Sequence, residues 1–169
     1  MMIVKGILLL SLLGVCSYMG IAMAGKFRLR LNQLQDFKKA LTLLQTKMKY
    51  TYQPIPEIFA QIGQTMPEPV GNIFLVSSQQ MENLTAQQAW EQTVQNARTN
   101  LKKEDKQVLL EFGKQLGKTD IEGQESQIAL TLTFLENRIE EAKKELEKNA
   151  KLYQTLGVVS GLALVIILL

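Results

Sequence analysis

Two uncharged apolar segments, one at each end of the chain, place the strongest constraint on how this sequence can fold. Residues 6–25 contain no charged side chain, and residues 152–169 contain none either. A helix of about 20 apolar residues is long enough to cross a hydrocarbon core about 30 Å thick. We therefore expect transmembrane helices at residues 4–25 and 152–169, with a charged domain at residues 26–151 between them.

The first apolar segment also has an alternative interpretation. Ala22-Met23-Ala24 followed by Gly25 resembles the small-residue site at which a signal peptide is cleaved. An uncleaved helix is favoured, because apolar residues continue beyond this site at steps of three and four, as in an amphipathic helix. These residues are Phe27, Leu31, Leu34, Phe37, Leu41, Leu44, Met48 and Tyr52.

Basic residues beside the two apolar segments predict the side of the membrane on which the central domain lies. Lys26, Arg28 and Arg30 follow the first segment, and Lys148 and Lys151 precede the second. Because positively charged flanks of membrane helices tend to stay in the cytoplasm, we expect these residues to set a topology with a cytoplasmic central domain. The lysines before the second segment are equally compatible with the solvated face of a helix.

The central domain has the pattern of an all-α protein. No segment of useful length alternates with the period of a strand, and all four prolines fall at breaks between apolar helical patterns. We expect a six-helix bundle whose first and last helices continue into the membrane segments. The first expected helix ends near residue 52. Four further helices include residues 55–63, 70–81, 85–97 and 108–116, and the sixth follows a cap at residue 119.

Helix start signals and one heptad pattern refine this expectation. Thr85 with Gln88, and Thr119 with Glu122, have the spacing of capping boxes, and Gly117 is placed to end a helix. The last helix carries apolar residues at alternating steps of four and three, which favours shallow packing against another helix. They are Ile128, Leu132, Leu135, Ile139, Ala142 and Leu146.

A glycine pair in the second apolar segment is a candidate for packing between membrane helices. Gly157 and Gly161 are four residues apart, and small residues at this spacing let two helices approach closely. A chance spacing of glycines in an apolar segment explains the pair equally well.

Composition argues against catalysis and against nucleic acid. The chain has no histidine and one cysteine, so it lacks the commonest general base and cannot assemble a Cys/His zinc site. Its 19 basic residues are interleaved with 16 acidic ones, unlike a surface that neutralises phosphates. We expect no enzymatic activity, no catalytic or metal site, no cofactor and no nucleic acid.

One tripeptide looks like part of a phosphate-binding loop but lacks its context. Gly117-Lys118-Thr119 would need a glycine at position 112, where the chain has Phe112, and a strand before the loop, where a helix is expected. We interpret it as a helix end followed by a helix start.

Several segments, in their order, resemble a known family. They are Leu31-Asn32-Gln33-Leu34, Met48-Lys49-Tyr50 before Pro54-Ile55-Pro56, Ala89-Trp90-Glu91, the run Phe112-Gly113-Lys114-Gln115-Leu116-Gly117-Lys118-Thr119-Asp120, and the segments 128–136 and 156–162. Over essentially its whole length the chain resembles the stage III sporulation protein AB family of endospore-forming bacteria. That family is itself similar to the inner-membrane platform protein of type II secretion and type IV pilus machines.

The resemblance implies a place in a secretion-like channel complex between mother cell and forespore. The protein would be a multi-pass protein of the outer forespore membrane, with its bundle in the mother-cell cytoplasm. There it would contact a secretion-type ATPase resembling stage III sporulation protein AA, together with other membrane components of the complex and the lipid bilayer. The exposed feature most like the family is the turn formed by Gly117, Lys118, Thr119 and Asp120, which is a candidate partner contact. A role in ending one helix and starting the next explains these four residues equally well.

The leading hypothesis is therefore a non-enzymatic platform that couples the ATPase to the membrane assembly. The alternative is an envelope-facing helical scaffold that is tethered by its C-terminal span after cleavage of the first segment. The two hypotheses place the central domain on opposite sides of the membrane.

Overall fold

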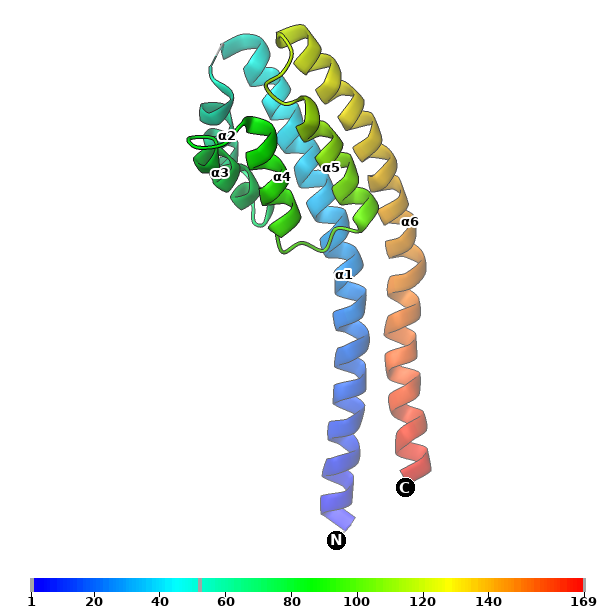
Figure 1. Cartoon of the computed structure of the whole chain (residues 1–169). Coiled ribbons are helices and arrows are strands. Elements are labelled where there is room, and N and C mark those ends of the chain that lie inside the picture. The colour runs from blue at the N-terminus through cyan, green and yellow to red at the C-terminus, as the bar shows by residue number, and fades with distance from the viewer. Residues whose placement is uncertain (1, 52, 169) are drawn as a thin grey trace. The chain divides into compact units, whose positions relative to one another are not determined.

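The computed structural model describes the backbone of residues 2–51 and 53–168, and the side-chain surroundings chiefly of residues 21–51, 53–149 and 151–156. Within this part of the chain there are six α-helices and no strand (Figure 1). The prediction of an all-helical chain with six helices is confirmed. The helices are α1 (Met2–Thr51), α2 (Ile55–Thr65), α3 (Val70–Gln80), α4 (Ala86–Asn96), α5 (Lys103–Gln115) and α6 (Ile121–Leu168).

The first and last helices continue through the apolar ends of the chain, as predicted. Among the described residues, no helix contains a stretch that is both long enough and apolar enough to cross a bilayer. Most side chains of the predicted spans at residues 4–25 and 152–169 lie outside the described residues, as do the surroundings of Gly157 and Gly161. The two transmembrane helices and the glycine contact therefore stay predictions.

The chain divides into two compact units. We call Asn32–Glu140 the bundle unit, and Met1–Leu31 together with Glu141–Leu169 the terminal unit. Both α1 and α6 contribute residues to each unit. The bundle unit falls inside the predicted domain at residues 26–151, whose limits at the membrane stay a prediction.

The core of the bundle unit is built from aromatic rings, one from each of its first five helices. Their centroids lie 4.9 Å apart for Phe59 and Phe74, 5.1 Å for Phe74 and Trp90, and 5.5 Å for Trp90 and Phe112. Phe37 of α1 lies 6.5 Å from Phe74. Tilted and edge-on pairs of this kind add to the free energy gained by burying the rings. Phe37 and Phe112, 75 positions apart in sequence, thereby belong to one cluster.

Trp90 is fixed in the core by both a hydrogen bond and a close glycine. Its indole Nε1 donates to the backbone oxygen of Leu109 over 2.7 Å, which satisfies the polar atom of a side chain that is 0% exposed. A side chain at Gly113 of α5 would collide with the Trp90 ring. Gly113 therefore makes room for the indole ring.

The apolar pattern of α1 predicts its buried face well. Leu34, Leu41 and Leu44 are fully buried, and Met48 is nearly so. Around this face α2 packs on α3, α3 on α4 and α4 on α5. The Thr85–Gln88 capping box at the start of α4 is confirmed, since the Gln88 backbone N–H donates to the Thr85 hydroxyl over 3.3 Å.

The heptad pattern predicted for α6 is only partly confirmed. Ile128, Leu135 and Ala142 are buried, but the predicted residues Leu132, Ile139 and Leu146 are half-buried. Polar side chains take part in the buried face, because Gln124 and Thr131 are each 2% exposed. The Thr131 hydroxyl donates to the Gln127 backbone oxygen over 2.8 Å, so burial leaves it a hydrogen bond.

Candidate functional site

The turn between α5 and α6 holds the four residues that the sequence singles out as a candidate contact. Gly117, Lys118, Thr119 and Asp120 are all exposed. Gly117 has a φ of 75°, a left-handed conformation that other residues adopt at a cost, and the Lys118 backbone N–H donates to the Gln115 oxygen over 3.1 Å. Gly117 thus ends α5 as predicted.

The start of α6 differs from the prediction by one residue. The Thr119–Glu122 capping box is wrong, because α6 begins at Ile121 and Asp120 is the residue before it. The Asp120 Oδ1 accepts from the Gly123 backbone N–H over 2.9 Å, which is the hydrogen bond of an N-terminal cap. Aspartate caps as well as threonine does, so the spacing of Thr119 and Glu122 alone does not identify the capping residue.

Thr119 has a different role in the same turn, because its hydroxyl contacts a side chain of α6. Its hydroxyl accepts from the Gln124 side-chain amide over 2.9 Å, and the same Nε2 donates to the Gln115 backbone oxygen over 2.7 Å. These two bonds tie the end of α5 to the first turns of α6. The candidate turn is consequently a braced segment that presents Lys118 and Asp120, of opposite charge, toward solvent.

A shallow hollow of about 300 Å³ lies beside this turn. Apolar side chains supply much of its wall, which suits contact with a protein surface better than binding of a charged small molecule. No cluster of metal-ligating side chains is found among the described residues. The hollow is lined by Met48, Gln53, Pro54, Ile55, Gly117, Thr119, Ile121 and Gln124.

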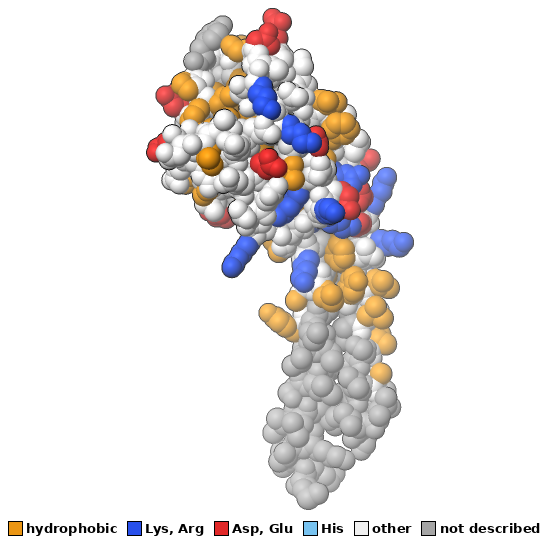
Figure 2. All heavy atoms as spheres, viewed as in Figure 1, with side chains coloured by type: hydrophobic (Ala, Val, Ile, Leu, Met, Phe, Trp, Pro, Cys, Tyr) orange, Lys and Arg blue, Asp and Glu red, His pale blue; other side chains and the backbone are white. Residues whose placement is uncertain are grey.

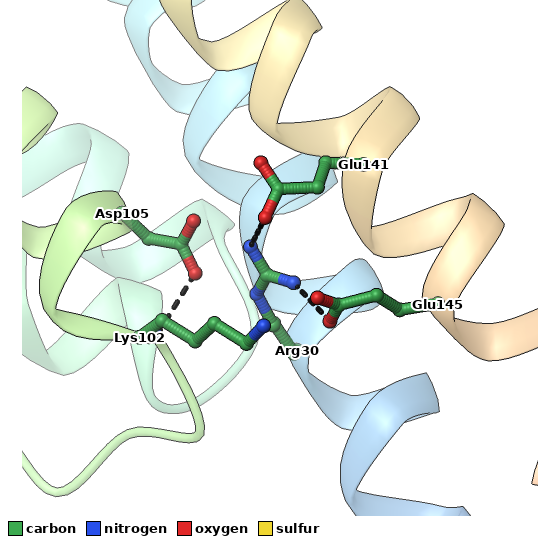
Figure 3. Close-up of polar contacts among 5 residues, drawn as sticks. All are labelled: Arg30, Lys102, Asp105, Glu141 and Glu145. Carbon is green, nitrogen blue, oxygen red and sulfur yellow. Dashed lines mark hydrogen bonds and ion pairs between the residues drawn. The ribbon is translucent and has the colours of Figure 1, made fainter. Parts of the chain in front are cut away.

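The terminal unit contains a second polar feature, which the sequence does not reveal. Arg30 is 3% exposed, and its Nη1 donates to the Glu145 Oε2 over 2.7 Å (Figure 3). Its Nη2 lies 3.8 Å from the Glu141 Oε1. The two glutamates are four residues apart and so share one face of α6. A single guanidinium therefore joins α1 to two acidic side chains of α6.

The five basic residues predicted to set the topology thus fall into two groups. Lys26, Arg28, Lys148 and Lys151 are exposed, whereas Arg30 is buried and ion-paired. The sequence places Arg30 among the flanking charges because spacing along one helix does not show a partner 115 residues away. Their effect on topology stays a prediction.

A third polar feature caps α5 within the bundle unit. The Asp105 carboxylate, which is fully buried, accepts from the Lys102 backbone N–H over 2.9 Å (Figure 3). An acidic residue three positions after the cap residue can accept a hydrogen bond from the backbone N–H of that cap residue, which otherwise has no partner in the helix. This cap explains why α5 begins at Lys103, five residues before Val108, the first of the apolar residues from which the helix was predicted.

Comparison with known proteins gives a consistent result. The family model described as "Stage III sporulation protein AB" matches residues 5–169. Stage III sporulation protein AB of Bacillus subtilis (strain 168) is similar to the chain, with 31% identity over 157 residues that cover 90% of this chain and 92% of that protein. A solved structure of stage III sporulation protein AB is also similar, with a TM-score of 0.66 and 30% identity, covering 70% of this chain and 96% of that one.

Proposed function

The chain belongs to the stage III sporulation protein AB family, and from this premise we propose that it is a non-enzymatic platform of a sporulation membrane complex. In this role it couples a secretion-type ATPase, resembling stage III sporulation protein AA, to the membrane assembly of the mother-cell-to-forespore channel. The protein lies on the mother-cell side of the outer forespore membrane. Its bundle unit is cytoplasmic, and other membrane components of the same complex are its further partners.

The observation that carries the proposal is the continuity of two helices between the apolar ends and the bundle unit. Single helices run over Met2–Thr51 and over Ile121–Leu168, and both belong to the bundle unit and to the terminal unit. A force or displacement applied to the bundle has two covalent, hydrogen-bonded routes to the ends of the chain. A coupling protein needs such a route, and a soluble binding domain on a flexible linker lacks it.

The braced turn at residues 117–120 is the part of the bundle unit that we propose as the ATPase contact. It is exposed, its backbone is held by capping bonds, and a hollow with apolar walls lies beside it. Binding loops that are fixed before the partner arrives lose little conformational entropy on association. Lys118 is the side chain expected to contribute most to specificity, because it extends from this turn without being needed for a cap.

The test is binding of the full chain, in detergent and in nanodiscs, to the purified ATPase. Lys118→Glu is expected to weaken binding about tenfold, equivalent to about 1.4 kcal/mol. The matched control is Lys103→Glu, which reverses an exposed charge at the start of α5. Absence of binding by the wild-type chain in both environments contradicts the platform role, and equal loss in the two variants contradicts the choice of the turn.

A second candidate function follows from Ala22-Met23-Ala24, the possible cleavage site within α1. If the chain is cut there, the bundle unit faces the envelope as a scaffold tethered by residues 152–169. Cysteine placed at the exposed position 82 by Glu82→Cys, with Cys16→Ser, separates the alternatives. Labelling by a membrane-impermeant reagent only after the cells are opened supports the platform, and labelling of intact cells together with a processed N-terminus supports the scaffold.

A further inference from the structure

The terminal unit exposes basic side chains from both of its helices. Six of them are solvent-exposed, and none forms an ion pair with another described residue. We call this set the basic belt. It consists of Lys26, Arg28, Lys143, Lys144, Lys148 and Lys151.

The acidic residues of the same unit do not neutralise this belt. Glu141 and Glu145 are engaged by Arg30, at 3.8 and 2.7 Å. Glu147 is the remaining acidic residue of the unit. The unit therefore has a net positive charge, because its sequence contains eight basic residues and three acidic ones.

Exposed apolar side chains belong to the same unit as the belt. Leu29 is 50% exposed on α1, and Leu152 and Leu156 are each 52% exposed on α6. Figure 2 shows exposed hydrophobic side chains gathered on one stretch of the surface, with Lys and Arg side chains beside them. Basic side chains next to an apolar surface are typical of the boundary between membrane and water, where long side chains reach the headgroups.

We propose that the basic belt binds the headgroups of anionic phospholipids. Lipids whose headgroup has a net negative charge fit this surface, because it offers several positive charges over a short length of two helices, next to apolar side chains that suit acyl chains. The inference rests on the membrane location given under the proposed function and adds to it a preference for one class of lipid. The neutral headgroup of phosphatidylcholine, by contrast, gains little from the belt.

The experiment uses the full chain reconstituted into phosphatidylcholine vesicles that contain a trace of spin-labelled lipid. Electron spin resonance separates lipids restrained by the protein from bulk lipids. Spin-labelled phosphatidylglycerol is expected to associate with the protein at least about fivefold more strongly than spin-labelled phosphatidylcholine. A fivefold ratio is about the contribution of one basic residue close to the headgroups. The preference is expected to fall at 1 M salt, where the Debye length is about 3 Å. Equal association of the two lipids overturns the proposal.

Variants assign the preference to the belt. Combined Lys26→Gln, Arg28→Gln, Lys148→Gln and Lys151→Gln is expected to remove most of it, whereas the control Lys103→Gln with Lys118→Gln, in the bundle unit, retains it. Full preference in the fourfold variant overturns the assignment. The lipid preference of the wild type and its dependence on salt are measured without any variant. The proposal is therefore still tested if the fourfold variant folds poorly.

Flotation of the same samples separates this inference from the proposed function. A chain that floats with the vesicles but does not discriminate between the lipids overturns the lipid preference and leaves the membrane platform standing. A chain that does not float with vesicles of either composition overturns the membrane location and the lipid preference together.

Discussion

The bundle unit is held together by aromatic rings, whereas the described part of the terminal unit is held by an arginine between two glutamates. In the bundle, Trp90 lies among phenylalanine rings and has one hydrogen bond. In the terminal unit, Arg30 pairs with Glu145, and Phe27 stacks on Tyr153 with centroids 5.8 Å apart. Ring packing tolerates small shifts, but a guanidinium between two carboxylates is directional, so it defines the register of α1 against α6 in that unit.

The largest effect is expected in the bundle. Trp90→Ala should lower the free energy of unfolding by about 3–5 kcal/mol, because it leaves a cavity among packed rings and removes the indole hydrogen bond to the Leu109 backbone oxygen. Urea denaturation followed by circular dichroism measures the loss. Trp90→Phe is the control that keeps a ring but removes the hydrogen bond, and it should cost clearly less. A loss below about 1 kcal/mol for Trp90→Ala contradicts the central role of this cluster.

Removing the arginine tests the terminal unit. Arg30→Gln should cost about 1–3 kcal/mol, less than a fully buried pair would, because Glu141 and Glu145 are partly exposed at 39% and 24%. Arg28→Gln, at an exposed site on the same helix, should cost under about 0.5 kcal/mol. A double-mutant cycle with Glu145→Gln should give coupling of about 1 kcal/mol or more, and additive losses would mean that the pair contributes nothing to stability.

The candidate turn is expected to be less costly to perturb. Gly117→Ala should destabilise the chain by about 1–2 kcal/mol, since alanine must adopt a left-handed conformation there. Gly117→Asn should cost less, because asparagine tolerates that conformation. Thermal unfolding of the two variants side by side provides the measurement. Equal stability of the alanine variant and the wild type would argue against the φ of 75° at this position.

Removing the cap at the start of α6 is expected to lower the free energy of unfolding by less, and to affect one backbone N–H in particular. Asp120→Ala should cost about 1 kcal/mol through loss of the bond to the Gly123 N–H. A direct comparison with Thr119→Ala separates the roles of the two neighbours, since Thr119 contacts the Gln124 side chain instead. Faster amide exchange at Gly123 only in the Asp120 variant is the specific readout. Faster exchange at Glu122 in the Thr119 variant would instead support the capping box that the spacing predicts.

The smallest effect concerns pH. A hydrogen bond from Lys114, at 2.6 Å, lowers the pKa of the exposed Glu111 carboxyl below its ordinary value of 4.5. Since the folded-state pKa lies below the unfolded one, the pair favours folding above the unfolded pKa, and this contribution is lost as the pH falls through the folded pKa. An NMR titration should give a lower Glu111 pKa in the wild type than in Lys114→Gln, and identical values would contradict the hydrogen bond.

Periodic patterns explain why most of the fold was predictable. The steps of three and four from Leu31 to Met48 describe a buried face directly, and prolines mark the breaks on either side of α2. Patterns fail where polar side chains are buried. Asp105 extends α5 toward its N-terminus by capping it. Gln124 and Thr131 occupy core positions of α6, where hydrogen bonds from the Gln124 Nε2 and the Thr131 hydroxyl reduce the cost of burying these side chains.

The candidate turn was predictable from its glycine, but its bracing was not. A glycine after an apolar pattern signals a helix end, and the φ of Gly117 confirms it. The bonds from Gln124 to Thr119 and Gln115 depend on how two helices meet, which no local pattern encodes. The same reason applies to Arg30, whose acidic partners lie more than 100 residues away and are evident only in three dimensions.

The chain's one tryptophan makes the bundle unit observable by itself. Trp90 is 0% exposed, and its neighbours are phenylalanine rings and the backbone of α5. Intrinsic fluorescence excited at the tryptophan band is therefore a built-in reporter that should emit at short wavelength when the bundle is folded and shift to the red when water reaches the ring. The tryptophan emission of unlabelled protein can follow the bundle unit in micelles, vesicles or a partner complex, because the terminal unit contains tyrosines but no tryptophan.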